Sequence, residues 1–174
     1  MFRRRQKQPM ETETEGGAQF AVEGAFYNPR MEMNRDITVG VLHAWRDRLR
    51  ETPTYLDANT ASGVRGVRAA LSGYDATLAD RSDKAVELAR RNVEENGVGD
   101  CAEVVHEDAN VVMRRSRYDV VDIDPFGSPI PFTDATFNSA DSLACFTATD
   151  TAPLCGAHDS GVRRYSCVPL NTTY

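Results

Sequence analysis

Residues 54–66 read TYLDANTASGVRG and indicate the type of fold. A short apolar run ends in Asp57, a turn of small residues follows, and residues 59–71 continue into a helical pattern. Glycine in such a turn allows a ligand to approach the backbone closely at the start of a helix. A strand, a glycine-containing turn and a helix in this order predict the first unit of an α/β domain.

The same alternation continues through most of the 174-residue chain. The predicted strands are 54–58, 76–80, 102–108, 118–124 and 144–150. The predicted helices between them are 59–71, 82–97, 109–115 and 133–143. We predict a mostly parallel, Rossmann-like α/β sheet with right-handed crossovers and helices on both faces, which ends here after about its fifth strand.

The first fifty residues differ in character. Residues 1–20 are polar, charged and glycine-containing, and we predict a flexible leader there, with the folded domain at 21–174. In residues 36–49 the apolar side chains recur at helical spacing. These side chains are Ile37, Val41, Leu42, Trp45 and Leu49. The spacing predicts a helix that packs on the core through this apolar face.

The composition limits the class of protein. Twenty Lys and Arg against 26 Asp and Glu give a net charge of −6, which argues against a wholly basic nucleic-acid binder but allows a local basic patch. The sequence contains no run of about 18 apolar residues, so we expect no transmembrane helix. The basic N-terminus leads into acidic residues and therefore predicts no secretory signal. The four cysteines form no C-x-x-C pair, so we expect no metal site and reduced thiols in a cytoplasmic protein.

Acidic side chains stand at the ends of four predicted strands. They are Asp57, Asp80, Asp108 and Asp124. One acid at the start of a loop is common, but the carboxyl ends of parallel strands meet at one edge of a sheet, where ligands bind. Four acids there, with a glycine-containing turn after the first, predict a ligand site.

The turn at 61–66 narrows the kind of ligand. Ala61 occupies the first glycine place of the G-x-G-x-x-G fingerprint that a pyrophosphate prefers. S-adenosylmethionine lacks phosphates and needs no such fingerprint. Asp80 lies where an acid can accept both ribose hydroxyls. Asp108 with Ala109 can meet the adenine, and Gly63 allows close approach of the backbone.

An arginine is expected to bind the methionine carboxylate of such a ligand. Arg35 and Arg65 are the two candidates, since a guanidinium pairs with a carboxylate as a charge-assisted fork. Other interpretations stay open at this point. Asp80 and Asp108 are also typical helix N-caps, and Arg65 is also typical of a solvated helix charge.

The most specific motif is DIDPFGSP at residues 122–129. A strand that ends in D-P before an aromatic residue suits methylation of an exocyclic base amine, which is a poor nucleophile. The Asp124 carboxylate can accept an N–H of that amine and take its proton. Phe126 can stack on the base. The alternative is a proline-rich turn with Phe126 in the local core.

Four segments together resemble the tRNA (guanine-N2)-dimethyltransferase family, in its archaeal form. They are FYNPRMEMNRD at 26–36, LDANTASGVRGVRA at 56–69, DIDPFGSP at 122–129 and TATDTAPLCGAH at 147–158. The resemblance implies a class I fold that depends on S-adenosylmethionine and two successive methyl transfers to N2 of the guanine at position 26 of tRNA. It covers the N-terminal catalytic portion of the family, whose members carry a further C-terminal domain that helps to hold tRNA.

The resemblance also implies roles for individual residues. Its cofactor-binding positions correspond to Arg35, Arg65, Asp80, Asp108 and Ala109, and its catalytic positions to Asp124 and Phe126. Binding of tRNA calls for basic patches. The candidates are 3–7, 114–117 and 163–164. No membrane or protein partner is expected.

Three other functions remain open from the residues. The first is a fragment that binds S-adenosylmethionine or RNA without catalysis. The second is a nucleotide-dependent oxidoreductase, against which the incomplete glycine fingerprint counts. The third is methyl transfer to another nucleic-acid amine.

Overall fold

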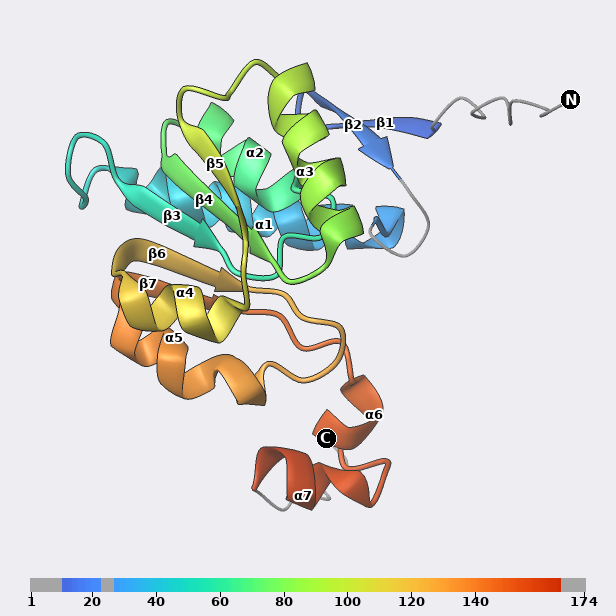
Figure 1. Cartoon of the computed structure of the whole chain (residues 1–174). Helices are drawn as coiled ribbons and strands as arrows, with labels where there is room; N and C mark the ends of the chain where they lie inside the picture. Colours follow the sequence, from blue (N-terminus) through green and yellow to red (C-terminus); the bar gives the residue numbers. More distant parts are fainter. Residues whose placement is uncertain (1–10, 23–26, 167–174) are drawn as a thin grey trace, which may run out of the picture.

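The computed structural model describes residues 11–22 and 27–166, and its centre is the predicted parallel sheet (Figure 1). The strands are β3 (Thr54–Asp57), β4 (Asp75–Asp80), β5 (Ala102–His106), β6 (Tyr118–Ile123) and β7 (Ala140–Phe146). They lie in the order β5-β4-β3-β6-β7, and every neighbouring pair is parallel. The Rossmann-like fold class is therefore confirmed.

Helices cover both faces of the sheet, as Figure 1 shows. One layer holds α1 (Glu32–Arg46), α2 (Val64–Leu71) and α3 (Asp83–Glu95), and the other holds α4 (Ala109–Arg115) and α5 (Thr133–Ser139). Two short 3-10 helices lie in the loops, η2 (Pro29–Met31) and η3 (Ile130–Phe132). Residues 151–166, which follow the last predicted strand, contain α6 (Thr151–Leu154) and α7 (Ser160–Tyr165).

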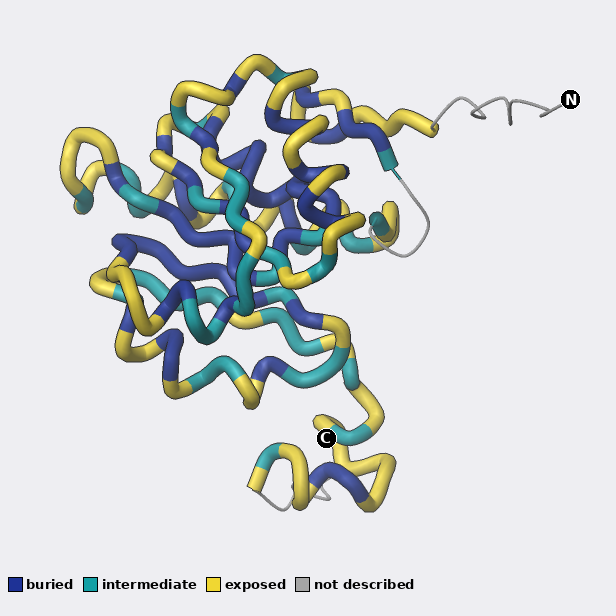
Figure 2. The backbone as a smooth tube through the Cα atoms, in the orientation of Figure 1, coloured by how far each residue is buried: buried dark blue, intermediate teal, exposed yellow. Residues whose placement is uncertain are grey.

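The core consists of two apolar layers because strand side chains alternate between faces. Tyr55 and Val120 contribute to the layer under α2 and α3, whereas their neighbours Leu56 and Val121 contribute to the layer on the α4 side. Both layers are fully buried at the central strands (Figure 2). A sheet buried on both faces explains why the strands appear in the sequence as continuous apolar runs.

The N-terminal segment differs from the prediction of a flexible leader over 1–20. Strands β1 (Glu11–Glu15) and β2 (Ala18–Val22) form an antiparallel hairpin, and only residues 1–10 of that range lie outside the described residues. Gly16 and Gly17 both have positive φ, which a tight hairpin turn requires. Phe20 is fully buried against the core below α2 and α3. The hairpin was not predicted because three of the five residues of β1 are glutamates, which concealed the strand.

Helix α1 also packs differently from the prediction. Leu42 is buried, but Ile37 and Val41 are 61% and 38% exposed. Arg35, a charged residue, is buried on the inner side of the helix. The face that turns inward is thus set by a buried ion pair of Arg35, which periodicity of apolar residues cannot reveal. Within the described part of the chain, no helix has the length and apolar character needed to cross a membrane.

One boundary prediction was wrong near the end of the sheet. The predicted helix 133–143 ends at Ser139, and β7 begins at once with Ala140 instead of at residue 144. Residues 147–150, predicted as the end of the strand, follow β7 as a loop. The polar residues of β7 are tolerated because it is the edge strand of the described sheet.

The packing of α2 on the sheet yields a stability prediction. A Cβ on Gly66 would lie 2.3 Å from the side chain of Leu78, so Gly66→Ala should lower the free energy of unfolding by about 1–3 kcal/mol. Gly40→Ala is the matched control, because a Cβ on this helical glycine meets nothing within 4 Å. It should raise the same free energy by up to about 1 kcal/mol. Urea unfolding of both variants measures the difference, and equal effects would contradict the packing argument.

Candidate active site

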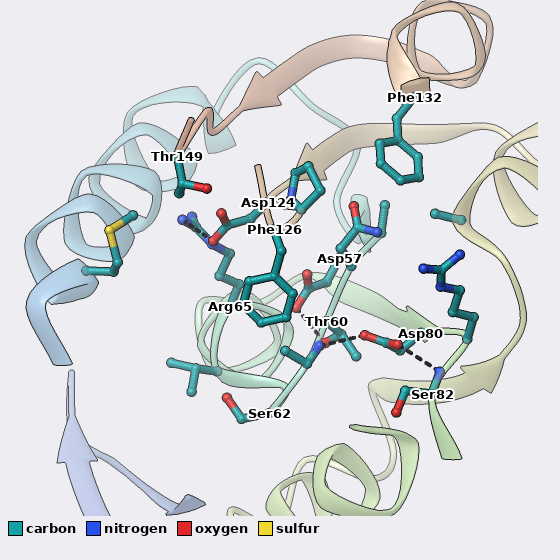
Figure 3. Close-up of a pocket in the computed structure, with 18 of the residues that line it drawn as sticks. Asp57, Thr60, Ser62, Arg65, Asp80, Ser82, Asp124, Phe126, Phe132 and Thr149 are labelled. Carbon is teal, nitrogen blue, oxygen red and sulfur yellow. Dashed lines mark hydrogen bonds and ion pairs between the residues drawn. The ribbon is translucent and has the colours of Figure 1, made fainter. Parts of the chain in front are cut away.

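A cavity of about 790 Å³ opens at the carboxyl ends of β3, β4 and β6 (Figure 3). The strand order runs outward from β3 to β5 on one side and from β3 to β7 on the other, so this is the point where the topology reverses. Ligands of doubly wound sheets bind at that point. Seven of the eight predicted site residues line the cavity: Arg35, Arg65, Asp80, Asp108, Ala109, Asp124 and Phe126.

The eighth predicted residue, Gly63, does not line the cavity. Its φ is +82°, and a Cβ there would lie 3.2 Å from both Ala89 and Leu78. The glycine therefore serves the turn and the packing of α2 against α3 and β4, and its role in ligand approach stays a prediction. Its neighbours Ser62 and Val64 line the cavity in its place.

Asp80 fastens the turn at residues 61–66 to the end of β4. One carboxylate oxygen accepts a hydrogen bond from the backbone N–H of Ala61 at 3.0 Å, and the other accepts one from Ser82 at 2.9 Å (Figure 3). Ala61 has a φ of +49°, in the region that favours glycine. Asp80 thus holds both the turn and the start of α3, and its remaining lone pairs face a ligand-sized space.

Asp108 caps a helix, as the alternative interpretation had it. Its Oδ1 accepts the backbone N–H of Asn110 at 2.8 Å, at the start of α4. One carboxylate oxygen is left for another partner at the cavity wall, next to Ala109. Capping and ligand contact are compatible here because a carboxylate has several acceptor sites.

Arg65 is buried, so the interpretation as a solvated charge was wrong. Its Nε donates to Asp124 at 2.9 Å, and its Nη1 donates to Asp122 at 3.2 Å and to Thr38 at 2.8 Å. Its Nη2 donates to the side chain of Asn34. The guanidinium fork is therefore occupied by protein acceptors, and the first of them is the acid of the D-P-F motif.

Acidic groups outnumber basic groups below the cavity. Asp57, Asp122 and Asp124 surround the single guanidinium of Arg65. Burial raises the pKa of Asp57 from 3.8 to about 7, and the nearby charge of Asp122 adds to the shift. Burial alone would lower the pKa of Arg65, but the carboxylates of Asp122 and Asp124 raise it. The site therefore has an excess of acceptors and suits a ligand rich in donors or carrying positive charge.

The motif loop is held open toward solvent. Phe126 is 80% exposed, so the interpretation of this ring as local core was wrong. Gly127 and Thr149 exchange two hydrogen bonds: the N–H of Gly127 donates to Oγ1 of Thr149 at 2.9 Å, and the N–H of Thr149 donates to the carbonyl of Gly127 at 3.1 Å. The segment after β7 thus fixes the loop that presents Phe126 at the cavity (Figure 3).

Sequence reasoning missed several residues of the cavity wall. Asn59 carries a buried Oδ1 without a partner, and Tyr27, Arg81 and Phe132 also line the space. Asn59 lies between Asp57 and the turn, so its position in TYLDANTASG was an available signal. Phe132 and Arg81 had none, because single aromatic or basic residues in loops are common. Among the described residues, no group of His, Cys, Asp or Glu side chains is arranged to hold a metal ion.

The predicted basic patches do not gather at the cavity. Residues 3–7 lie outside the described residues. Arg115 and Arg117 form ion pairs with Glu107 and Asp141, and Arg164 forms one with Asp150. None of these three arginines lines the cavity.

A parallel sheet with an acceptor-rich cavity at its topological switch point defines the class of Rossmann-like α/β folds that bind a ligand at the carboxyl ends of the strands. Solved structures of that class superimpose on the chain at low sequence identity. The tRNA m1G37 methyltransferase of Methanocaldococcus jannaschii has a TM-score of 0.65 at 14% identity, over 78% of this chain and 41% of that one. Pyrococcus horikoshii TYW2 in complex with MeSAdo has a TM-score of 0.63 at 14% identity, over 75% and 48%.

The chain belongs to the N2,N2-dimethylguanosine tRNA methyltransferase family, whose model matches residues 7–174. The tRNA (guanine(26)-N(2))-dimethyltransferase of Halobacterium salinarum is 55% identical over 91% of this chain and 43% of the relative. That of Methanosarcina mazei is 48% identical over 86% and 41%. The chain thus spans less than half the length of these curated archaeal relatives, and the predicted family resemblance is confirmed.

Burial of Asp57 leads to a testable pH dependence. Because its pKa is about 7 in the folded protein and near 3.8 in the unfolded chain, the folded state holds a proton between these values that the unfolded state has released. Stability should therefore fall as pH rises from about 4 to about 7, by up to about 1.4 kcal/mol per unit from this group. Asp57→Asn should remove this component, because an amide does not ionise. It should keep the local structure, since an amide oxygen still accepts from Thr60 and Gly66.

Urea unfolding across this pH range measures the effect. The matched control is Asp75→Asn, which changes an exposed carboxylate at the start of β4 and should keep the dependence of the parent protein. An unchanged slope in Asp57→Asn would show that Asp57 ionises normally in the folded state.

Proposed function

We propose that this chain is the S-adenosylmethionine-binding, catalytic portion of an enzyme that methylates N2 of the guanine at position 26 of tRNA, first once and then twice. The observation that carries the proposal is the placement of Asp124 beside the exposed ring of Phe126 at the mouth of the cavity. The names of the curated relatives support the substrate.

The residues present fit S-adenosylmethionine. Its ribose hydroxyls, exocyclic amine and ammonium group are all donors, and the cavity offers acceptors on Asp80, Asp108 and Asn59. The Oδ1 of Asn59 is buried without a partner, so a donor from a ligand would relieve its desolvation. When bound, S-adenosylmethionine supplies an electrophilic methyl group on a sulfonium, whose positive charge the surrounding carboxylates favour.

Of the two arginines predicted to meet the methionine carboxylate, Arg35 suits this role better. The fork of Arg65 is already shared among Asp122, Asp124 and neighbouring oxygens. Arg35 lines the cavity, and within the described part of the chain its Nη1 donates to one acceptor, the carbonyl of Asn28 at 3.2 Å. One N–H of that nitrogen is left for a ligand, because each terminal nitrogen of a guanidinium carries two.

Asp124 is then the base of the reaction. Its carboxylate, 24% exposed, can accept an N–H of the guanine amine and take the proton as the methyl group is transferred. Arg65 holds this carboxylate in one orientation through its Nε. Phe126 can stack on the guanine, since its ring is exposed and its loop is fixed by Thr149. Positioning of the amine supplies much of the rate.

Family membership disfavours the oxidoreductase alternative, and the incomplete glycine fingerprint agrees with this. The alternative of a fragment that binds without catalysis remains a distinct outcome, because the relatives are more than twice as long. A cytoplasmic location is proposed as well, since tRNA is modified where it is available to soluble enzymes.

Cofactor binding is tested by thermal unfolding of the 174-residue chain with S-adenosylhomocysteine. At about one hundred times its Kd, the ligand should stabilise the folded state by about 2.7 kcal/mol and raise Tm. NAD at the same concentration is the matched control and should leave Tm unchanged. A cooperative transition that S-adenosylhomocysteine does not move would contradict the cofactor assignment.

The role of Asp124 is tested by Asp124→Asn, which keeps the shape and removes the base. Methyl transfer to tRNA should fall by a factor of about 10²–10⁴, while the Kd for S-adenosylhomocysteine changes little. Asp134→Asn, an exposed acid on α5, serves as control and should keep both. If Asp124→Asn loses affinity for S-adenosylhomocysteine by the same factor as it loses methyl transfer, the assignment of Asp124 as the base is contradicted. Absence of transfer by the parent chain, with intact cofactor binding, would favour the non-catalytic alternative.

A further inference from the structure

Glu15 stands out because its carboxylate is completely buried on a hairpin whose other glutamates are exposed. Nε of Arg35 donates to Oε1 of Glu15 at 2.8 Å and to Oε2 at 3.0 Å. Nη2 of Arg35 donates to Oε2 at 2.6 Å. Nη1 of Arg68 donates to the carboxylate as well. The carboxylate is thus shared by two guanidiniums, one on α1 and one on α2.

The same carboxylate reaches the wall of the cavity. The hydroxyl of Tyr27, a lining residue, donates to Glu15 at 3.2 Å. The guanidinium of Arg35 lies over the Tyr27 ring, 5.0 Å from its centroid, and donates to the carbonyl of Asn28. Arg35, Tyr27 and Asn28 all line the cavity, so one side of the wall is assembled around Glu15.

The hairpin that carries Glu15 is itself fixed to the turn at residues 61–66. Asn92 of α3 is fully buried; its Oδ1 accepts the N–H of Ala21 at 2.7 Å, and its Nδ2 donates to the carbonyl of Ala21 at 3.0 Å. The same Nδ2 donates to the carbonyl of Ser62 at 2.7 Å. Ser62 lines the cavity, so the hairpin and the turn share one buried side chain.

Burial explains why the orientation of Arg35 depends on Glu15. A guanidinium taken out of water needs a compensating charge, and removal of one partner from a buried pair leaves the other uncompensated. Among residues 11–22 and 27–166, Arg35 has no acidic partner besides Glu15. Without the Glu15 charge, its long side chain would turn toward solvent or toward the carboxylates of the site.

We propose that Glu15 is a positioning residue for cofactor binding, which holds the Arg35 guanidinium so that its spare Nη1 N–H is available to the carboxylate of the methionine moiety. The hairpin is then part of the cofactor site. This inference rests on the proposed function, in which Arg35 receives that carboxylate.

The test compares two ligands by isothermal titration calorimetry. S-adenosylhomocysteine contains the amino-acid moiety, whereas 5′-methylthioadenosine has the same nucleoside without it. Glu15→Gln should weaken binding of S-adenosylhomocysteine by about tenfold or more, the value of a hydrogen bond to a charged group, and change binding of methylthioadenosine less than about twofold. Glu13→Gln, an exposed glutamate on the same strand, is the matched control and should affect neither ligand.

A purely structural role of Glu15 gives a different result. It would weaken both ligands by the same factor, and this outcome, or no change for either ligand, would overturn the proposal. If Glu15→Gln does not fold, Glu15→Asp is measured instead, because it keeps the negative charge beside Arg68 and shortens the reach to Arg35. The same difference between the two ligands is expected for it.

Arg35→Gln separates the proposal from the function on which it rests. It should reproduce the selective loss of S-adenosylhomocysteine affinity. If Arg35→Gln affects both ligands equally or neither, the assignment of Arg35 to the carboxylate fails, and the role of Glu15 fails with it. If Arg35→Gln is selective and the Glu15 variants are not, only the inference about Glu15 fails.

Discussion

A single buried guanidinium, that of Arg65, stands between the carboxylates of Asp122 and Asp124 and so links the core of the sheet to the mouth of the cavity. Loss of one partner from a buried charge pair costs about 3–5 kcal/mol, because the remaining charge is left without compensation. Here two acids compete for one cation, and a third, Asp57, lies nearby. The structure tolerates this excess of negative charge because one acid holds its proton more tightly than an exposed acid would.

The same constraint explains the chemistry proposed for the site. An excess of acceptors at the switch point of a parallel sheet attracts a ligand with donors and positive charge, which is the character of a sulfonium cofactor. The base, Asp124, gains orientation from Arg65 without being buried, and the neighbouring ring of Phe126 stays open to a base from outside. The hairpin at the N-terminal end of the described chain shows the reverse ratio of charges. There a single carboxylate, that of Glu15, pairs with two arginines.

Much of the fold could be predicted because it depends on local patterns. All five strands of the sheet, and the helices between them, appear at the expected places, with Ser139 and Ala140 as the main boundary error. The inward face of α1 could not be predicted, because a charged residue, Arg35, lies inside while Ile37 lies outside. The hairpin was missed for a similar reason: Glu15 looks like Glu11 and Glu13 in the sequence, and only its contacts with distant arginines distinguish it.

The sequence by itself determined that acids and a turn of small residues would meet at one edge of a parallel sheet. Parallel strands place their carboxyl ends side by side, so Asp57, Asp80 and Asp124 converge whatever the details of packing. Only the tertiary structure decided which charge pairs with which. Arg65 binds Asp124 instead of facing a ligand alone, Arg35 binds Glu15, and Gly63 faces a helix instead of the cavity. Such pairings join segments that are far apart in the chain, and many combinations of the same charges are compatible with the local patterns. Among the described residues, burial selects the combination in which each buried guanidinium, of Arg35, Arg65 and Arg68, has an acid.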